Sequence, residues 1–411
     1  MPSSNIKKYD IALLGATGFT GGLTAEYLLQ AQRRETFSLA LAGRSLKRLN
    51  VLRRRLKALG LDCSNVSLVK VDVHQQNSVE ELAAQTQVVA SAIGPYVQYG
   101  EPVVRACVNQ GVDYVDVSNE SEFVEFVQRK FHCEAQAKGL RIVNCCGFDS
   151  IPHDLGVLYA VREMAKHITA GGSEQTIQGE ALKVEGFVSA SADFSGGSWH
   201  SAVNAMARYS KYLREQRYWR KQATPAYPHS NRIIKALPMD VRYQSSLQAW
   251  SLPLPSIDPQ IVLRSAEALV DYGARFEYGH NVVFKHLPKA MVITAAAGGT
   301  FVLAQLRPSR KWLLGLKAAG QGPGQTARQN AWFKVVIQVQ SSQNFLQAEI
   351  NGGDPGYSET AKMFAESALC LAMDKPGNSH FGVITPAMAM GEYLIDRLQR
   401  AGLGFITVEA R

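Results

Sequence analysis

The stretch from residue 9 to residue 29 places the strongest limit on the fold of this chain. An apolar run, "YDIALL", leads directly into Gly15, Gly18 and Gly21, and an amphipathic stretch follows. A strand that ends in such a turn and continues as a helix lets the backbone approach a pyrophosphate and aims helix N–H groups at it. The spacing GxxGxxG therefore predicts a nucleotide-binding unit. The residues expected to contact the nucleotide are Gly15, Ala16, Thr17, Gly18, Phe19, Thr20 and Gly21.

The rest of the first 150 residues alternates short apolar runs with stretches in which apolar residues return every three or four positions. This alternation is typical of a parallel sheet covered by helices. Residues 5–152 are therefore predicted to form a Rossmann-type, doubly wound α/β domain. Its expected strands are residues 10–15, 37–43, 66–73, 87–94, 113–118 and 141–147.

The chain has 411 residues, which is too long for a single ordinary core, and its pattern changes after Pro152. Residues 153–374 are predicted to form a second, α+β domain with a mixed or antiparallel sheet. Its expected strands are residues 261–266, residues 274–284 and two antiparallel segments within residues 333–352. A basic helix that carries aromatic residues is expected at residues 208–222, and amphipathic helices are expected at residues 359–374 and 388–405.

The end of the second predicted strand indicates which dinucleotide the glycine turn holds. NAD-binding domains usually carry Asp or Glu there to bond the ribose 2′-hydroxyl, but this chain has Gly43 and Arg44. Because an arginine presents a planar fork of donors that suits a phosphate, NADP(H) is favoured over NAD(H) as the cofactor. Ser45, Lys47 and Arg48 are expected to add to this phosphate site.

Two further strand ends are expected to reach the cofactor. Asp72 follows the third strand, where its carboxylate is predicted either to contact the adenine edge or to cap the next helix. After the fourth strand, Gly94 lets the backbone pass close to the nicotinamide ribose. The candidates at this edge are Ala92, Ile93, Gly94 and Tyr96.

The net charge of +9 is concentrated in residues 278–348, which contain no Asp or Glu. Within this region, residues 291–306 are uncharged but fall short of the roughly 20 apolar residues that a membrane-spanning helix needs. Residues 307–317 combine basic residues with Trp312, as membrane-interface segments do. The expected partners of the region are a membrane, contacted peripherally, or an acyl carrier protein, and nucleic acid is not expected. A core helix with a basic, solvated outer face is the alternative.

The six cysteines form no CxxC pair and no spacing with histidine that is typical of a metal site. The sequence therefore predicts neither a metal centre nor a disulfide framework. Residues 1–10 lack the apolar core of a secretory signal. A cytoplasmic protein is expected, peripheral at the membrane if the basic region meets lipid.

Motifs along the whole chain resemble those of the saccharopine dehydrogenase-like oxidoreductases. The segments that carry the resemblance are "GATGFTG", "AGRS", "GPYVQYGEPVVRAC", "YVDVSNE", "CGFDSIPHDLG", "SGGSWHSA", "GGDPGYSETA" and "GVITPAMAMGEYLIDRL". The last three are similar to the branch of trans-acting enoyl reductases. Where family members often carry Thr-Gly-Glu after the fifth strand, this sequence has Ser118-Asn119-Glu120.

The resemblance implies NADP(H) as the hydride donor and the reduction of a carbon–carbon double bond in an acyl chain held on a carrier protein. It also implies that the second domain binds substrate and forms a homodimer. Residues 375–411 are then expected to be a C-terminal helical segment that packs back on the first domain.

Hydride transfer to a double bond also needs an acid that supplies a proton. Asp149 and Ser150 directly follow the sixth strand, at the edge where ligands gather in open α/β sheets, and Tyr96 lies near the same edge. These three residues are the catalytic candidates. The alternative is that Asp149 and Ser150 only form a turn and that Tyr96 only packs.

None of the 15 tyrosines has a lysine four residues later, which excludes the activated tyrosine of short-chain dehydrogenases. The sequence thus favours an NADPH-dependent enoyl-type reductase of a lipid or polyketide-like acyl substrate. A saccharopine-type amino-acid dehydrogenase is one alternative. The other is a non-catalytic, membrane-associated NADP-binding scaffold or sensor.

Overall fold

The computed structural model describes residues 7–170, 176–191, 196–220, 232–317, 324–377 and 380–411, without the side chains of 196–198, 210, 211, 213 and 215–220. It divides into two compact units. The first consists of residues 1–151 and 357–402, and the second of residues 152–356 and 403–411. Residues 221 and 222 of the predicted basic helix lie outside the described residues.

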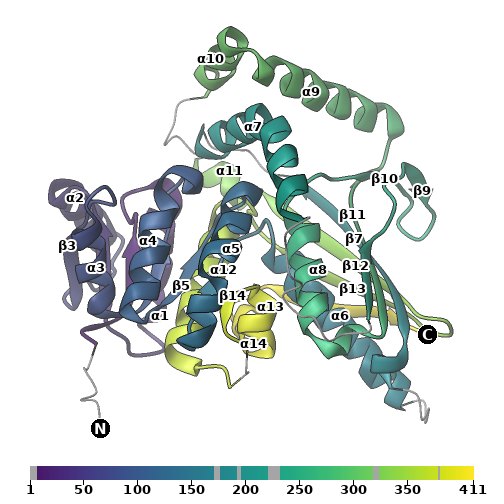
Figure 1. The fold of residues 1–411 in the computed structure, drawn as a ribbon, viewed down its shortest axis with the longest axis horizontal. Coiled ribbons are helices and arrows are strands. Elements are labelled where there is room, and N and C mark those ends of the chain that lie inside the picture. Colours follow the sequence, from purple (N-terminus) through teal and green to yellow (C-terminus); the bar gives the residue numbers. More distant parts are fainter. Residues whose placement is uncertain (1–6, 171–175, 192–195, 221–231, 318–323, 378–379) are drawn as a thin grey trace. The chain divides into compact units, whose positions relative to one another are not determined.

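The first unit contains a seven-stranded parallel sheet with the strand order β14-β6-β5-β4-β1-β2-β3 (Figure 1). Its central strands are almost wholly buried because helices cover both faces, and this accounts for their continuous apolar sequences. The strands are β1 (Tyr9–Leu14), β2 (Leu39–Gly43), β3 (Val66–Lys70), β4 (Thr86–Ser91), β5 (Asp113–Asp116), β6 (Arg141–Val143) and β14 (Gly382–Ile384).

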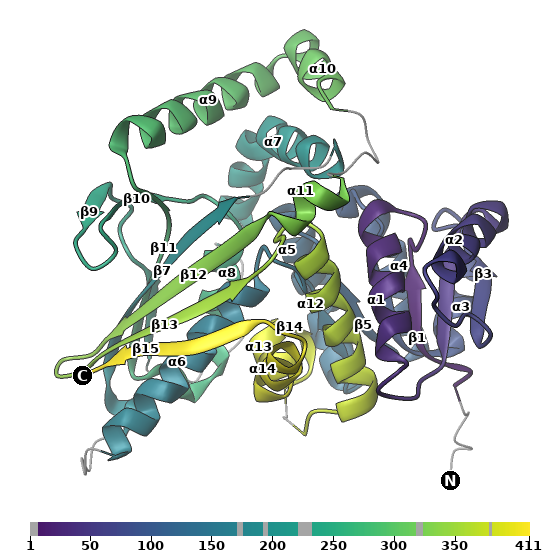
Figure 2. The same cartoon turned by 180° about the vertical axis from the view of Figure 1, so that it is seen from behind.

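The helices of this unit form two layers. On one face lie α3 (Gln76–Ala84), α4 (Tyr96–Gln110) and α5 (Ser121–Ala137), which pack side by side (Figure 1). On the other face, Figure 2 shows α1 (Phe19–Ala31), α2 (Leu46–Ala58) and α12 (Ser358–Leu369). Two shorter helices follow β14, namely α13 (Pro386–Ala389) and α14 (Gly391–Arg400). The Rossmann-type fold predicted for the first domain is confirmed.

The chain returns to the first unit at Tyr357, earlier than residue 375, where the sequence placed the return. α12 packs against α1 and against β4 and β5, so its buried face belongs to the core of this unit. β14 then adds a seventh parallel strand beside β6.

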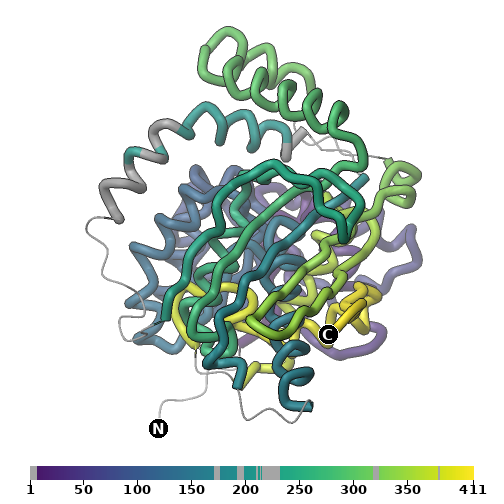
Figure 3. Tube along the Cα trace, turned by 90° about the vertical axis from the view of Figure 1, so that its right-hand side faces the viewer, coloured from purple at the N-terminus to yellow at the C-terminus, as the bar shows by residue number. Residues whose placement is uncertain are grey.

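The second unit contains a mixed sheet with the order β15-β13-β12-β7-β11-β10-β9, in which β8 also pairs with β11. β7 and β8 run parallel to β11, and the remaining pairs are antiparallel. Figure 3 shows these strands lying side by side. They are β7 (Ala181–Ser191), β8 (Ile233–Ala236), β9 (Arg242–Gln244), β10 (Ala249–Pro253), β11 (Arg275–Phe284), β12 (Trp332–Gln340), β13 (Phe345–Gly352) and β15 (Gly404–Ala410).

Two helices cover one face of this sheet. α6 (Ile151–Ala170) packs on β12 and β13 through Gly156, and α8 (Asp258–Ala268) packs on β8 and β11. A separate layer consists of α7 (Gly196–Arg220), α9 (Leu287–Gln305) and α10 (Arg307–Gly315), which contact one another (Figure 1). The remaining short helix is α11 (Gln325–Gln329). The α+β class with a mixed sheet is confirmed.

Two elements predicted from the sequence differ from the structure: the strand 261–266 of the second unit is wrong, and the helix 388–405, which lies mostly in the first unit, is shorter than predicted. Residues 261–266 lie inside α8 and not in a strand; Ile261, Val262, Ser265 and Ala266 are buried at helical spacing, and Pro259 stands in the first turn of the helix. The predicted helix 388–405 ends at Arg400, because Gly402 adopts a φ of +90° and the chain continues as β15 beside β13.

Candidate functional site

Glycines hold the turn between β1 and α1 in a form that a larger residue would disrupt. Gly15 has a φ of +86°, and a Cβ there would lie 2.8 Å from the carbonyl oxygen of Ala92. A Cβ at Gly21 would collide with the carbonyl oxygen of Gly15. The turn is therefore packed closely against the loop after β4 and against the start of α1, as a pyrophosphate-binding turn requires.

The N-terminus of α1 is suited to an anion. Gly18 is the N-cap, and among the described residues no side chain caps this helix. The N–H groups of the first turn are thus available to a ligand, and the helix dipole favours negative charge there.

A pocket of about 210 Å³ lies where β1, β2, β3 and β4 end. Its lining residues are Gly15, Thr17, Gly18, Gly43, Arg44, Arg48, Val71, Val73, His74, Ala92, Ile93, Gly94 and Tyr99. The structure thus brings the glycine turn, the end of β2 and the loop after β4 together around one space. Sequence reasoning did not single out Val71, Val73 or His74; their only signal was their place at the end of a strand.

Two guanidinium groups give this pocket its positive charge. Arg44 follows β2 directly and is exposed, and Arg48 lies one turn into α2, where its Nη2 is 3.4 Å from the carbonyl oxygen of Thr17. Ser45 is the N-cap of α2, and its Oγ accepts a hydrogen bond from the Arg48 amide at 3.3 Å. Lys47 is exposed and lies outside the pocket lining. Among the lining residues, the guanidinium cations are therefore those of Arg44 and Arg48.

The loop after β3 forms another wall. The carboxylate of Asp72 accepts a hydrogen bond from the His74 amide at 3.1 Å, so this side chain stabilises its own turn and does not line the pocket. The His74 ring meets the Tyr99 ring edge-on at 5.6 Å. The wall offered to a ligand is therefore aromatic and apolar.

Four residues of the predicted turn, Ala16, Phe19, Thr20 and Gly21, are not among the residues that line the pocket. Ala16 is fully buried. The Phe19 ring packs edge-on against Tyr357 at 4.9 Å, and the Thr20 carbonyl accepts a hydrogen bond from Thr24 at 2.9 Å. These residues support the turn through their packing and hydrogen bonds.

Tyr96 lies below the cofactor edge and not on it. Its hydroxyl is buried and donates to the Ser91 carbonyl at 2.9 Å, and its ring packs against Phe123. Burial raises the pKa of Tyr96, and the nearby carboxylate of Asp116 raises it further. This geometry supports a packing role and gives no support to proton donation by Tyr96.

The loop after β5 is fixed by a buried carboxylate that sequence reasoning did not select. Asp116 accepts hydrogen bonds from the Tyr114 hydroxyl at 2.9 Å, from the amide and hydroxyl of Ser118 at 2.9 and 2.7 Å, from Asn144 at 2.7 Å and from the Cys145 amide at 3.0 Å. These bonds join the ends of β5 and β6. The available signal was an Asp at a strand end followed by Ser and Asn, which is typical of turns.

Glu120, the residue shared with the Thr-Gly-Glu pattern, also has a defined place. Its carboxylate accepts hydrogen bonds from the amides of Tyr96 at 2.8 Å and Val97 at 3.0 Å, at the start of α4. It thereby satisfies two N–H groups that a helix start leaves unpaired. The loop after β5 and the helix after β4 are held together by this contact.

The two candidates after β6 differ in exposure. Asp149 is exposed and accepts a hydrogen bond from the Asn119 amide group at 3.0 Å. Ser150 is buried, and its hydroxyl donates to the Asp149 carbonyl at 2.6 Å. Of the catalytic candidates, Asp149 alone presents its functional group to solvent at the edge of this unit.

Comparison with known proteins agrees with this site. The family of the saccharopine dehydrogenase NADP-binding domain matches residues 11–143. Together with the parallel sheet and the glycine turn, this match defines an NADP-dependent oxidoreductase. The matched range contains every residue that lines the pocket.

Relatives match almost the whole chain. A putative trans-acting enoyl reductase of Mycobacterium tuberculosis (strain ATCC 25618 / H37Rv) is 32% identical over 426 residues, which cover 98% of each protein. A trans-acting enoyl reductase of Mycobacterium ulcerans (strain Agy99) is 31% identical over 439 residues, again 98% of each. The chain belongs to the saccharopine dehydrogenase-like family, in the branch of the trans-acting enoyl reductases.

A solved structure extends the comparison to the fold. The apo, histidine-tagged saccharopine dehydrogenase (L-Glu forming) of Saccharomyces cerevisiae aligns with a TM-score of 0.53 and 14% identity, over 98% of this chain and 100% of the yeast chain. At this identity the likeness concerns the fold alone.

Proposed function

We propose that the protein uses NADPH to reduce the carbon–carbon double bond of an enoyl group in a lipid or polyketide-like acyl substrate. The observation that carries the proposal is the pocket in which an uncapped helix N-terminus and two arginines surround one space. The full-length relatives named trans-acting enoyl reductases supply the reaction class. The saccharopine-type alternative is not better supported, since its solved representative shares only 14% identity.

The residues that surround this pocket fit NADPH better than NADH. The N-terminus of α1 suits the pyrophosphate, and Arg44 with Arg48 suits the 2′-phosphate, because a guanidinium offers charge and several donors to a phosphate. A carboxylate that would bind a free ribose 2′-hydroxyl is missing among the described lining residues. When bound, NADPH supplies the hydride.

Asp149 is the residue we propose for proton supply. Reduction of an enoyl thioester adds a hydride at one carbon and requires a proton at its neighbour. Asp149 is exposed in the turn between β6 and α6, and the Asn119 amide group donates a hydrogen bond to its carboxylate. Ser150 would then act only by shaping the turn that presents Asp149.

Helix α9 and helix α10 form the surface that we propose for contact with an anionic membrane. α9 is the one helix among the described residues that is long and apolar enough to cross a membrane, with 19 residues, a mean hydropathy of 1.5 and 11% burial. It starts four residues before the uncharged run, at Leu287, and ends one residue before the end of that run, at Gln305. The most exposed large apolar residues of the surface are Met291, Val292, Val302, Leu306, Trp312 and Leu316.

Basic residues flank this apolar surface on both sides. Lys289 is in the first turn of α9, and Arg307, Arg310 and Lys311 are in α10. Exposed apolar area bordered by Lys and Arg favours a peripheral position in an anionic lipid interface. An acyl substrate dissolved in or delivered from a membrane would be within reach of such an enzyme, so the surface and the proposed substrate agree.

The reaction is tested with purified protein, NADPH and a 2,3-unsaturated acyl thioester, offered free and on an acyl carrier protein. The expected result is oxidation of NADPH with a product heavier by two hydrogens, and with deuterium-labelled NADPH one deuterium on the acyl chain. Asp149→Asn is expected to lower kcat while leaving NADPH affinity unchanged. Consumption of NADPH without a reduced acyl product would contradict the proposal.

The lipid contact is tested by liposome flotation with and without anionic lipid. Val292→Asp, on α9, is expected to lower binding, whereas Val270→Asp, at a similarly exposed position outside the helix layer, is the matched control and is expected to bind normally. Retention by an acyl carrier protein but not by liposomes would assign the surface to the carrier.

A homodimer is also expected from the family resemblance, and light scattering tests it.

A further inference from the structure

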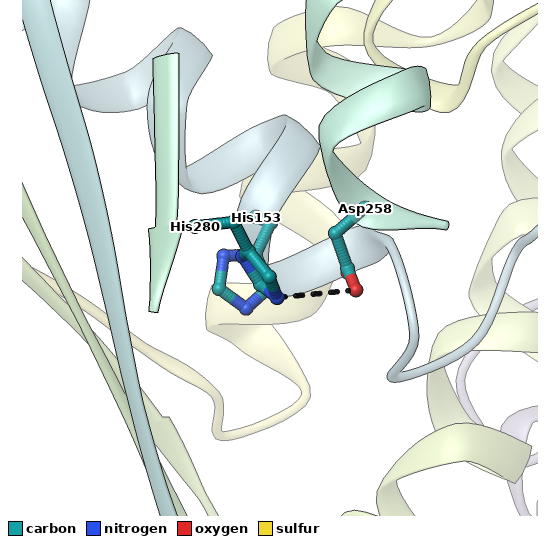
Figure 4. A group of neighbouring side chains, drawn as sticks. All are labelled: His153, Asp258 and His280. Atoms are coloured by element: carbon teal, nitrogen blue, oxygen red, sulfur yellow. Dashed lines mark ion pairs between the residues drawn. The ribbon is translucent and has the colours of Figure 1, made fainter. Parts of the chain in front are cut away.

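Three potential metal ligands meet inside the second unit, and one of them lies more than 100 residues before the other two in the sequence. Figure 4 shows His153, from the first turn of α6, His280, from β11, and Asp258, the first residue of α8. One ligand atom from each lies within 4.8 Å of the others, and Nε2 of His280 is 3.5 Å from a carboxylate oxygen of Asp258. All three residues are buried, with at most 8% of their surface exposed.

Neighbouring hydrogen bonds orient these side chains. The Tyr278 hydroxyl is 3.1 Å from Nδ1 of His153 and 3.4 Å from Nδ1 of His280. Each ring is therefore held through its own Nδ1 atom. The Ser256 hydroxyl donates to the Asp258 carboxylate at 2.5 Å. Outer partners of this kind are typical of metal-binding histidines, because they fix the tautomer and direct the other ring nitrogen to the metal.

The backbone also makes room for this arrangement. A Cβ at Gly186, on the neighbouring strand β7, would lie 2.6 Å from the Tyr278 hydroxyl oxygen and 3.1 Å from Nδ1 of His153. The glycine therefore permits the close approach of the tyrosine and the histidine. The absence of a side chain at this position thus serves the cluster of Tyr278 and His153 and not only the strand β7.

One of the potential ligand atoms has no hydrogen-bond partner among the described residues. Nε2 of His280 is buried and accepts or donates no hydrogen bond to any residue that the structure describes. A buried polar atom of this kind is costly to leave unsatisfied, and a cation between Nε2 and the Asp258 carboxylate would satisfy it.

We propose that His153, Asp258 and His280 bind one divalent first-row metal ion of the Zn²⁺ type. Tetrahedral Zn²⁺ with ligands at about 2.0–2.2 Å places neighbouring ligand atoms roughly 3.4 Å apart, close to the 3.5 Å between His280 and Asp258. Imidazole and carboxylate are the ligand types that such ions accept. The site links α6, α8 and β11, and its role is to stabilise the second unit.

The charge of the region suits a dication. A second buried carboxylate, Asp154, follows His153 and accepts a hydrogen bond from Ser265 at 2.5 Å. Two carboxylates match the charge of one divalent ion. The proposal is independent of the coenzyme and of the enoyl substrate.

The experiment uses full-length protein made metal-free with a chelator and titrated with Zn²⁺ alone. The expected result is binding of one equivalent per chain by calorimetry and by metal analysis after gel filtration, with a rise in Tm. His280→Gln and Asp258→Asn are each expected to weaken binding by at least tenfold and to abolish the rise in Tm. His286→Gln removes an exposed histidine outside the cluster and is the matched control.

Two further measurements keep the test decisive if a ligand variant fails to fold. Co²⁺ bound to the unmodified protein is expected to give the visible absorption of a tetrahedral N,O site. Tyr278→Phe, which removes only the outer partner, is expected to weaken Zn²⁺ by about 10- to 100-fold while retaining one site. No stoichiometric binding by the unmodified protein, or equal binding by His280→Gln and His286→Gln, would overturn the proposal.

Discussion

Arg44 provides the most direct test of coenzyme selection, because its guanidinium lines the pocket while its own position at the end of β2 leaves it exposed. Replacing it by alanine removes one charged donor group from the 2′-phosphate site without changing the glycine turn. A hydrogen bond to a charged group contributes about 1.5–3 kcal/mol. Exposure and the remaining charge of Arg48 favour the lower end of this range.

A loss of about 1.5 kcal/mol corresponds to roughly a tenfold weaker affinity for NADPH. NADH lacks the 2′-phosphate, so its affinity should change by less than about twofold, because a nonspecific charge effect falls off with distance and salt. Arg44→Asp should go further, since a carboxylate would repel the phosphate and offer an acceptor to a free ribose hydroxyl. The ratio of NADPH to NADH affinity is therefore the quantity to measure.

The assay is a titration of intrinsic tryptophan fluorescence with each coenzyme at fixed ionic strength. Lys47→Ala is the matched control, because Lys47 is an exposed cation three residues after Arg44, in the first turn of α2, and lies outside the pocket lining. It should leave both affinities unchanged. If Arg44→Ala weakened NADPH and NADH equally, or if Lys47→Ala reproduced the loss, the assignment of Arg44 to the 2′-phosphate would be refuted.

Three other predictions follow from contacts in the structure. Gly21→Ala should abolish NADPH binding in fluorescence titrations because its Cβ collides with the turn, whereas Gly22→Ala should be tolerated, since its nearest neighbour would be 3.7 Å away. Arg397→Met should lower the free energy of unfolding in urea by about 3–5 kcal/mol, because the buried guanidinium pairs with Glu35, Glu366 and Asp374 and its loss leaves those carboxylates without it. Hydrogen bonds from Arg275 and Lys235 lower the pKa of Glu277. Its ion pairs should therefore add less than about 1 kcal/mol to the free energy of unfolding at pH values above the pKa of an unfolded Glu. The difference in free energy of unfolding between wild type and Glu277→Gln should vanish as the pH falls through the lowered pKa of Glu277.

The parts of the fold that the sequence predicts correctly are those set by local pattern. Buried parallel strands read as continuous apolar runs, so β1, β2 and β4 are visible without any tertiary information. The same rule fails at residues 261–266, where β-branched residues are buried on one side of α8. There the tertiary environment, and not β-propensity, selects the conformation.

The pocket could be predicted only in part, because a strand end is visible in sequence but the direction of a side chain is not. Arg44 and Ile93 follow strands and line the pocket, whereas Asp72 turns back to its own loop and Tyr96 points into the core. Whether a side chain lines the pocket or turns away from it depends on the other hydrogen-bond partners within its reach. A hydrogen bond to a nearby amide holds Asp72, and the Ser91 carbonyl holds Tyr96.

The histidine cluster marks the limit of sequence reasoning for the opposite reason. Metal sites are recognised in sequence when ligands follow one another at fixed spacing, as in CxxC pairs. His153, Asp258 and His280 come from a helix, a helix start and a strand that meet only after the second unit has folded. Ser256 and Tyr278 each lie two residues from a ligand in the sequence, but Tyr278 reaches His153 only in the folded unit, so the geometry cannot be read from any one segment. A residue set that is unremarkable in sequence becomes a candidate site because folding removes water from it and leaves one ring nitrogen without a partner.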